Sequence, residues 1–234
     1  MNQKTGAVIP CYNEALCISD VVSRACKLVD ISVVADDNST DDTVEKVRQH
    51  KAYIMRNHGK RGVGANTQAG FDKALALGCD FVVTLDGDGQ HNPDEIPELL
   101  KPLLNGDADI VIGTRFKGDE GSVPPYRRLG IRTITWLYNI WNKQKLSDTL
   151  CCFRAFNRNV LSTVYPSEPG YAFCVEMLIK ARHAGYSISE IPVHVLYHSQ
   201  LEQNSSRDPI TLGIALALGV IKWRIKTELL GMSN

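Results

Sequence analysis

The sequence predicts an α/β protein built on a mostly parallel sheet that is flanked by helices. Along the first half of the 234-residue chain, short apolar runs rich in β-branched residues alternate with longer segments of helical pattern. Strands that are joined through helices make right-handed crossovers and lie parallel to one another. Each apolar run also ends in polar or glycine-bearing residues, which is typical of the ligand-binding edge of such a sheet.

The apolar runs place the strands, and the segments between them place the helices. Ser39 or Thr40 is suited to capping a helix, because a side-chain hydroxyl can accept an N–H group of the first turn. Asn92 and Pro93 similarly favour a helix start. The expected strands are residues 7–9, 31–35, 52–55, 81–83 and 109–113. The expected helices are residues 16–28, a helix that begins at the Ser39 or Thr40 cap and ends near residue 50, residues 64–77 and residues 95–104.

The second half of the chain has a different pattern. Residues 116–125 form a polar loop with glycine and proline, which we expect to act as a flexible lid. Pro192 cannot donate to a strand ladder, so the strand around it is expected at the sheet edge. His194 and His198 have helical spacing, but Pro192 argues against a helix and so against a metal pair there. The remaining expected elements are a helix from 126 through 141, a turn and strand within 147–158, a helix at 174–183, a strand at 188–196 and a helix at 209–230.

The composition excludes several classes of protein. Hydrophobic residues make up 44% of the chain, and 26 Lys plus Arg balance 26 Asp plus Glu, so no bulk charge favours nucleic acid as a partner. Seven cysteines without a Cys-x-x-Cys pair argue against a disulfide framework and a zinc site, and we therefore expect a reducing, cytoplasmic location. No stretch approaches the roughly 20 apolar residues that span a bilayer.

Two aspartates follow the strand at 81–83 directly. In extended backbone Asp86 and Asp88 point the same way, while Gly87 and Gly89 leave room for a ligand close to the backbone. Two converging carboxylates repel each other unless a cation lies between them, and a hard divalent cation bound through oxygen suits this arrangement. Taken alone, an Asp-x-Asp segment is more often a solvated Asp-Gly turn than a metal site.

Polar residues follow the other strands as well. Because the carboxyl ends of parallel strands meet at one edge, these groups are expected to share a rim with the aspartate pair. The glycine-bearing loop 59–64 fits neither a dinucleotide fingerprint nor a P-loop, so a bound nucleotide would be held by metal and aspartates. The groups expected at the rim are Tyr12 and Glu14, Asp36 and Asp37, loop 59–64, Asp86 to Gln90, and Gly113 to Arg115.

Basic residues mark the region after the fifth strand. Arg115, Arg127, Arg128 and Arg132 lie close in sequence, and guanidinium groups match phosphate oxygens, although a solvated basic face is the alternative. The segment 209–230 begins apolar and ends with a tryptophan and cations, which is typical of an interfacial helix. Docking of that helix on the sheet or on a second copy of the chain is the alternative.

The motifs, in this order and spacing, resemble the family 2 glycosyltransferases and, within them, the polyprenyl-phosphate sugar transferases of the dolichyl-phosphate mannose synthase type. The resemblance extends from about residue 7 to 209. It implies a GT-A fold, which is Rossmann-like. The motifs that carry it are Pro10-x-Tyr12-Asn13-Glu14, Val34-Ala35-Asp36-Asp37-x-Ser39-x-Asp41, Leu85-Asp86-Gly87-Asp88-Gly89-Gln90-His91, Gly113-Thr114-Arg115-Phe116, Arg127-Arg128-Leu129-Gly130 and Phe153-Arg154-Ala155.

The resemblance implies a donor side that binds a nucleotide diphosphate sugar of the GDP-mannose or UDP-glucose type. In such a site, residues 1–115 form the nucleotide-sugar and metal-binding half. Nucleoside contacts would come from Pro10, Tyr12, Glu14, Asp36 and Asp37, and Asp86, Asp88 and Gln90 would hold Mg²⁺ or Mn²⁺ against the diphosphate.

The resemblance also implies an acceptor side, formed by residues 116–208, that binds polyprenyl or dolichyl phosphate. Arg115, Arg128 and Arg132 would grip the acceptor phosphate, so that Asp88, Arg115 and Arg128 form the catalytic set. Relatives usually carry a Gly-x-Ser-Lys-like segment after the last strand, whereas this chain has Arg207 in place of the lysine and lacks the glycine. The enzyme would work at the cytoplasmic face of a membrane, with residues 209–234 as an interfacial or dimerising helix.

Two alternative functions remain open from the sequence. A family 2 transferase acting on a sugar or protein hydroxyl would need a general base, for which Asp148 and Glu176 are candidates. Their other roles would be a cap or turn for Asp148 and an exposed helix position for Glu176. The second alternative is a non-catalytic nucleotide-sugar-binding partner subunit, which the intact Asp86, Asp88 and Gln90 set disfavours.

Overall fold

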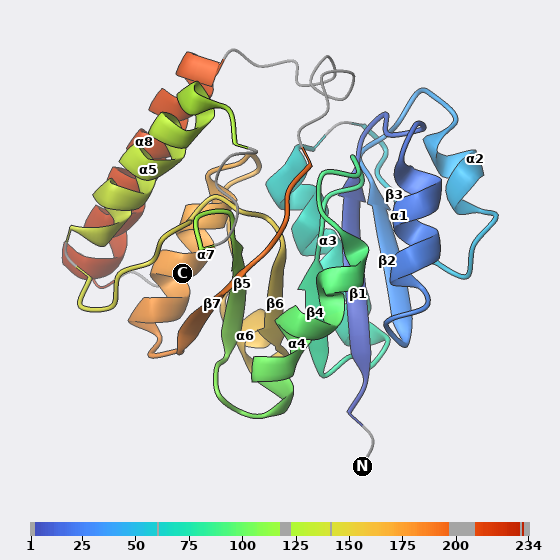
Figure 1. The fold of residues 1–234 in the computed structure, drawn as a ribbon, viewed down its shortest axis with the longest axis horizontal. Helices are drawn as coiled ribbons and strands as arrows, with labels where there is room; N and C mark the ends of the chain where they lie inside the picture. Colours follow the sequence, from blue (N-terminus) through green and yellow to red (C-terminus); the bar gives the residue numbers. More distant parts are fainter. Residues whose placement is uncertain are drawn as a thin grey trace.

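A single seven-stranded sheet forms the centre of the molecule (Figure 1). The computed structural model describes residues 3–59, 61–117, 123–140, 142–196, 209–229 and 231. The strand order is β3-β2-β1-β4-β6-β5-β7, and every pairing is parallel except those of β6 with β4 and β5. The predicted α/β class with a mostly parallel sheet is confirmed. The strands are β1 (Thr5–Cys11), β2 (Ile31–Asp36), β3 (Tyr53–Arg56), β4 (Phe81–Thr84), β5 (Ile110–Thr114), β6 (Arg154–Asn157) and β7 (Ile188–Pro192).

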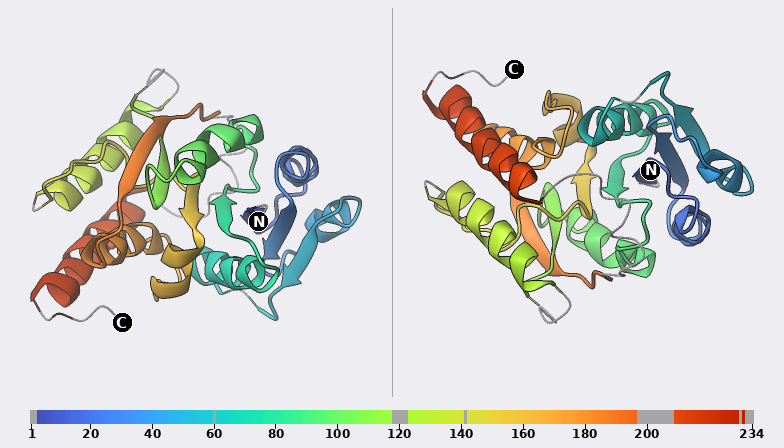
Figure 2. Two further views of the ribbon diagram at one scale, coloured as in Figure 1. Left: turned by 90° about the horizontal axis from the view of Figure 1, so that it is seen from below. Right: turned by 90° about the horizontal axis from the view of Figure 1, so that it is seen from above.

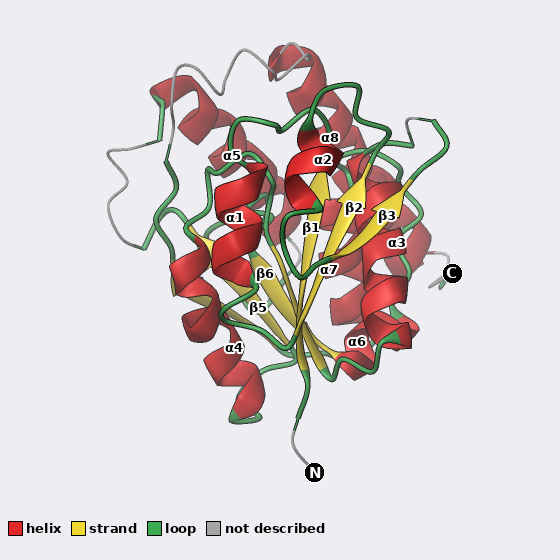
Figure 3. Cartoon of the chain, turned by 90° about the vertical axis from the view of Figure 1, so that its right-hand side faces the viewer, coloured by secondary structure: helices red, strands yellow, loops and turns green. Residues whose placement is uncertain are grey.

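Helices cover both faces of the sheet. Figure 3 views the sheet nearly edge-on, with α1 and α4 on one face and α3, α6 and α7 on the other. The central strands β1 and β4 are therefore buried on both sides, which explains their continuous apolar runs. The helices are α1 (Ile18–Ala25), α2 (Thr43–Val47), α3 (Val63–Ala76), α4 (Ile96–Leu104) after a 3₁₀ turn at Pro93–Glu95, α5 (Pro125–Asn139), α6 (Arg158–Thr163), α7 (Phe173–His183) and α8 (Pro209–Arg224), which continues as a π-helical turn over Ile225–Leu229.

The last helix packs on other helices rather than on the sheet. α8 lies beside α5 and also contacts α7, and Figure 2 shows α5 and α8 side by side at one end of the molecule. Trp223 is buried at this junction. Within the described ranges, no helix is both long and apolar enough to cross a membrane.

Most expected elements form close to their predicted bounds, with three differences. The helix cap predicted at Ser39 or Thr40 is wrong: α2 begins at Thr43, whose N–H is accepted by Asp41, while the Ser39 hydroxyl accepts the N–H of Asn13. The short helix α6 was not predicted, although its cap Asn157 accepts the N–H of Val160. The strand expected at 188–196 ends at Pro192, and it lies at the sheet edge as predicted.

Candidate active site

A cavity of about 450 Å³ opens where the carboxyl ends of β1, β2, β4 and β5 meet. Its lining combines side chains from the sheet rim with others from α5, α7 and α8, so distant parts of the sequence form one space. Of the residues singled out above, the cavity brings together Pro10, Tyr12, Glu14, Asp37, Asp86, Asp88, Gln90 and Arg115, joined by Arg127. Asp36, Arg128 and Arg132 are not part of this lining.

The aspartate pair lies on the turn that follows β4. The side chain of Asp86 is 32% exposed toward the cavity, and Asp88 accepts the N–H of Gln90 at 2.9 Å. A Cβ at Gly87 would lie 2.9 Å from Cδ1 of Ile18 and 3.0 Å from Cβ of Cys11, so the site is tightly packed, and Gly89 adopts a φ of 76° that disfavours other residues. These glycines were expected to leave room for a ligand close to the backbone, whereas in the structure they face the side chains of Ile18, Cys11 and Cys17.

Three carboxyl groups share this part of the cavity. Burial, followed by repulsion from Asp88, raises the pKa of Asp86, and burial also raises the pKa of Asp88. Burial and the charges of Asp88 and Asp41 raise the pKa of Glu14 to about 8. Such an accumulation of acidic oxygens fits a hard divalent cation, which would relieve the repulsion. Among the residues that the structure describes, no group of three or more His, Cys, Asp and Glu side chains is arranged as a complete metal site.

His91 supports the aspartate turn, a role that the sequence reasoning missed. Its Nδ1 accepts the N–H of Asp86 at 3.3 Å, and its ring packs against that of Phe153. Burial, together with the positive charge of Arg115, lowers the pKa of His91 to about 3. The imidazole is therefore neutral at physiological pH and remains a hydrogen-bond acceptor.

The two aspartates after β2 have different positions. Asp37 reaches the cavity, but its carboxylate also holds the following loop: Oδ1 accepts the N–H of Arg61 at 2.7 Å and Oδ2 that of Gly62 at 2.9 Å. Asp36 is fully buried beneath the rim, where it accepts the N–H of Ser39 and pairs with Arg56 at 3.3 Å. Asp36 therefore positions the loop at the end of β2 and does not face the cavity.

The start of α3 packs directly on the segment before α7. The N–H of Gly64 donates to the carbonyl of Pro169 at 2.8 Å, and a Cβ on Gly64 would lie 2.2 Å from the carbonyl oxygen of Glu168. The Glu168 side chain in turn accepts from the indole of Trp223 at 3.0 Å and pairs with Lys222 on α8. The C-terminal helix thus supports the wall of the cavity that Asp37 and Gly62 line, a contact that no local sequence signal indicates.

Arg115 is fixed by a buried ion pair. Its Nε donates to Oδ2 of Asp148 at 2.6 Å and its Nη2 to Oδ1 at 2.8 Å. Asp148 is fully buried and also accepts the N–H groups of Leu150 and Cys151. This carboxylate is saturated with donors and holds Arg115 at the rim, which is not the environment of a general base.

Glu176 is likewise saturated. Contrary to the exposed position considered above, it is fully buried in α7, where Oε1 accepts the N–H of Ser167 at 2.7 Å and Oε2 that of Glu168 at 2.8 Å. Lys180 pairs with it at 3.0 Å. Glu176 therefore anchors the segment that packs on α3.

The other arginines and the remaining predicted features occupy several environments. Arg128 donates to the carbonyl of Val123 at 3.2 Å, and Arg132 lies over the ring of Phe116 at 5.5 Å. His194 pairs with Glu95 at 2.6 Å on the surface. Half of the expected lid (residues 118–122), His198 and the segment 203–207 with Arg207 lie outside the described residues.

Comparison with known proteins connects this site to a family. The model of the family described as glycosyl transferase family 2 matches residues 7–165, which is more than half of the chain. The polyprenol monophosphomannose synthase of Mycolicibacterium smegmatis is 33% identical over 205 residues, covering 82% of this chain and 77% of that protein. The UDP-N-acetylglucosamine--dolichyl-phosphate N-acetylglucosaminyltransferase of Methanococcus voltae is 27% identical over 212 residues, covering 81% and 84%.

Solved structures show the same fold. The glucosyl-3-phosphoglycerate synthase from Mycobacterium tuberculosis, in complex with Mn²⁺ and UDP-glucose, matches with a TM-score of 0.72 at 22% identity, covering 96% of this chain and 79% of that one. This likeness concerns the fold alone, and it confirms the expected GT-A architecture. Together with the family match over the donor-side motifs, it leads to one conclusion: the chain belongs to glycosyl transferase family 2.

Proposed function

We propose that this protein is a metal-dependent, inverting glycosyltransferase that moves a hexose from a nucleotide diphosphate sugar to polyprenyl phosphate. One observation carries the proposal: a single cavity joins the Asp86–Asp88 pair to an arginine-bearing rim and to apolar side chains of α5 and α8. The polyprenol monophosphomannose synthase and the dolichyl-phosphate N-acetylglucosaminyltransferase named above support a lipid phosphate acceptor. GDP-mannose and UDP-sugars are the donors to compare.

The donor would occupy the part of the cavity formed by residues 1–115. Pro10, Tyr12 and Asp37 would face the nucleoside, and Asp86, Asp88 and Gln90 would hold Mg²⁺ or Mn²⁺. When bound, the cation would neutralise charge on the leaving diphosphate, and diphosphate and water oxygens would complete its coordination. Asp36 would act indirectly, by positioning the loop at the end of β2.

The acceptor would enter from the side formed by residues 116–208, where Arg127 lines the cavity next to Arg115, the last residue of the donor half. A phosphate is already an anion at neutral pH, so its attack needs alignment rather than deprotonation. Asp148 holds Arg115 in a fixed orientation, which suits a group that aligns an anion. The saturated carboxylates of Asp148 and Glu176 disfavour the alternative acceptor, a hydroxyl group, because that reaction needs a base.

The apolar end of the cavity fits a polyprenyl chain. Its walls include Ile131 and Ile134 of α5 and Leu212 and Leu216 of α8. The outer faces of the same two helices expose further apolar side chains, with Trp136 at 65% and Leu218 at 60% exposure. Such a paired face would rest on the cytoplasmic surface of a membrane, where the acceptor lipid resides. The exposed apolar residues include Leu129 and Trp136 on α5, Ile140 at its C-terminal cap, Ile214, Leu218 and Ile221 on α8, and Ile225 in the π-helical turn that follows α8.

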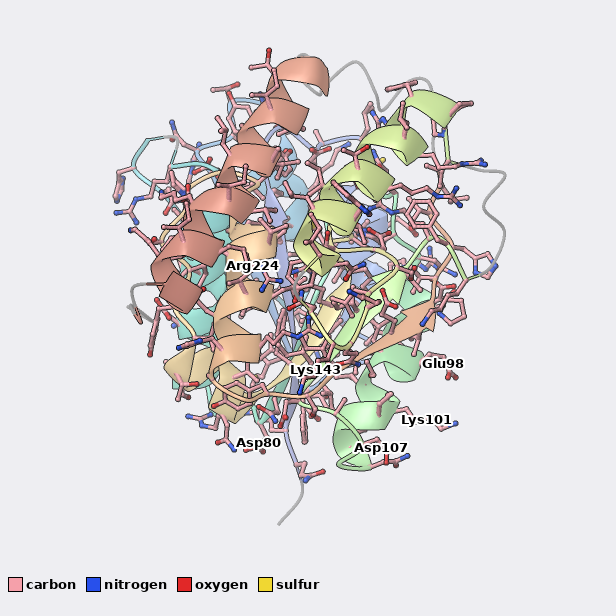
Figure 4. The ribbon with its side chains drawn as sticks, turned by 90° about the vertical axis from the view of Figure 1, so that its left-hand side faces the viewer. Asp80, Glu98, Lys101, Asp107, Lys143 and Arg224 are labelled. Carbon is pink, nitrogen blue, oxygen red and sulfur yellow. The ribbon has the colours of Figure 1, made fainter. Side chains whose placement is uncertain are left out.

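A donor screen tests the proposal. Purified protein is incubated with Mn²⁺ or Mg²⁺, short-chain polyprenyl phosphate and, in turn, GDP-mannose, UDP-glucose, UDP-galactose and UDP-N-acetylglucosamine, and lipid-linked sugar is quantified. One donor should give product that disappears with EDTA and in Asp88→Asn. Asp107→Asn is the matched control, because Asp107 is exposed at the opposite end of the molecule (Figure 4) and should behave as wild type. Absence of product with every donor, or equal activity in Asp88→Asn, would refute the proposal.

A further inference from the structure

Two cysteines from distant parts of the chain meet in the wall of the cavity. Cys152 lies just before β6 and Cys174 in the first turn of α7, and their sulfur atoms are 3.4 Å apart. Both line the cavity, Cys152 half-buried and Cys174 buried. A sulfur–sulfur distance of this size is van der Waals contact between two thiols, and a disulfide requires a further approach to about 2.05 Å.

A buried arginine holds the two cysteines in place. Arg154 is 2% exposed, and its guanidinium donates to the carbonyl oxygen of Cys151 at 2.7 Å, to that of Cys174 at 2.8 Å and to that of Thr149 at 2.7 Å. One rigid, planar group thus binds both backbone segments that carry the thiols. The pair is therefore pre-organised, so that reaction between the two sulfurs is an intramolecular step at high effective concentration.

We propose that Cys152 and Cys174 form a peroxide-sensitive dithiol site whose oxidation closes a reversible disulfide in the active-site cavity. Hydrogen peroxide would oxidise one of the two thiols to a sulfenic acid with release of one water molecule. The other thiol then attacks the sulfenic sulfur, the S–O bond breaks, the S–S bond forms and a second water molecule leaves. The two thiols lose two electrons and two protons in total, and peroxide takes them up.

Closing this disulfide would alter the wall of the cavity. The sulfurs must approach by about 1.3 Å to reach the bond length, which draws the segment before β6 toward the first turn of α7. Gly170 and Tyr171, directly before α7, line the same cavity as Asp86. We therefore expect oxidation to reduce transferase activity at least tenfold and reduction with dithiothreitol to restore it. This effect on activity rests on the proposed function, whereas formation of the disulfide does not.

Peptide mapping of the full-length protein tests the site directly. Folded protein is treated with hydrogen peroxide, free thiols are blocked with N-ethylmaleimide, and a digest is analysed by mass spectrometry with and without dithiothreitol. We expect a peptide pair joined through Cys152 and Cys174, lighter by two hydrogen atoms, that forms faster in folded protein than in urea. Cys152→Ser and Cys174→Ser should each abolish it, and Cys26→Ser should not, because Cys26 lies outside the cavity lining.

Several results would overturn this inference. Wild-type protein that accumulates sulfinic acid at Cys152 or Cys174 without the crosslink would show that the thiols cannot pair, and this test does not depend on how the variants fold. Crosslinking of Cys152 to another cysteine would also refute the assignment. A complete Cys152–Cys174 disulfide that leaves transferase activity unchanged would refute its effect on the cavity. Failure of the donor screen with the crosslink present would count against the proposed function only.

Discussion

Replacing Glu176 tests whether the carboxylates near the cavity are structural or catalytic. Glu176 is fully buried and is bound by two N–H groups of the segment before α7, by the Ser167 hydroxyl and by Lys180, whose side chain is 5% exposed. Removing one partner of a buried ion pair leaves the other charge uncompensated, at a cost of about 3–5 kcal/mol. We expect Glu176→Ala to lower the free energy of unfolding by about this amount and Glu176→Gln by about 1–3 kcal/mol.

Equilibrium urea unfolding, followed by circular dichroism, measures these changes. Glu98→Ala is the control, because Glu98 is exposed on α4 (Figure 4), and it should stay within about 0.5 kcal/mol of wild type. A catalytic base would give the opposite pattern for Glu176→Gln, with normal stability and a large loss of kcat. Wild-type stability in Glu176→Ala would therefore refute the structural role and bring the hydroxyl-acceptor alternative back.

Two further predictions concern the rim of the cavity. The pKa of Glu14 rises from 4.5 to about 8 on folding, so between these values the folded protein binds more protons than the unfolded protein, and its stability falls as pH rises. Metal-free Glu14→Gln should therefore gain stability relative to wild type between about pH 5 and pH 8. A difference in the free energy of unfolding that stays constant with pH in urea unfolding would contradict this prediction. Gly64→Ala places a Cβ 2.2 Å from the carbonyl oxygen of Glu168 and should lower the free energy of unfolding by about 1–3 kcal/mol and weaken nucleotide binding. Glu98→Ala, on the exposed surface of α4, should instead leave binding unchanged; similar behaviour of the two variants would show that the contact of α3 with Glu168 is unimportant.

The position of the aspartate pair at the rim of the cavity could be predicted from the sequence because its signal is local. Asp86 and Asp88 follow a strand whose apolar run identifies it, although they lie on the turn after β4 and not in the extended backbone that was expected. The parallel sheet follows from the alternation of strands and helices. The antiparallel direction of β6 could not be predicted in the same way. It depends on the tertiary pairing of β6 with β4 and β5, and no short turn connects β6 to either strand.

The supports of the site escaped the sequence reasoning because they are tertiary contacts. Glu168 joins the start of α3 to Trp223, 55 residues further along the chain. Asp148 and Glu176 look like available carboxylates in the sequence, and only their burial and hydrogen-bond partners reveal that both are saturated. The contact between Cys152 and Cys174 likewise has no spacing signature, since it depends on how α7 packs beside β6.

The most direct test of the proposed function compares two acceptors that differ only in the phosphate. Wild-type protein, Mn²⁺ and the donor identified by the screen are incubated with a polyprenyl phosphate or with the polyprenol of the same chain length, and lipid-linked sugar is quantified by mass spectrometry. We predict product from the phosphate and none from the alcohol, because Arg115 and Arg127 can align an anion and the saturated carboxylates cannot act as a base. Equal transfer to the alcohol would contradict the account.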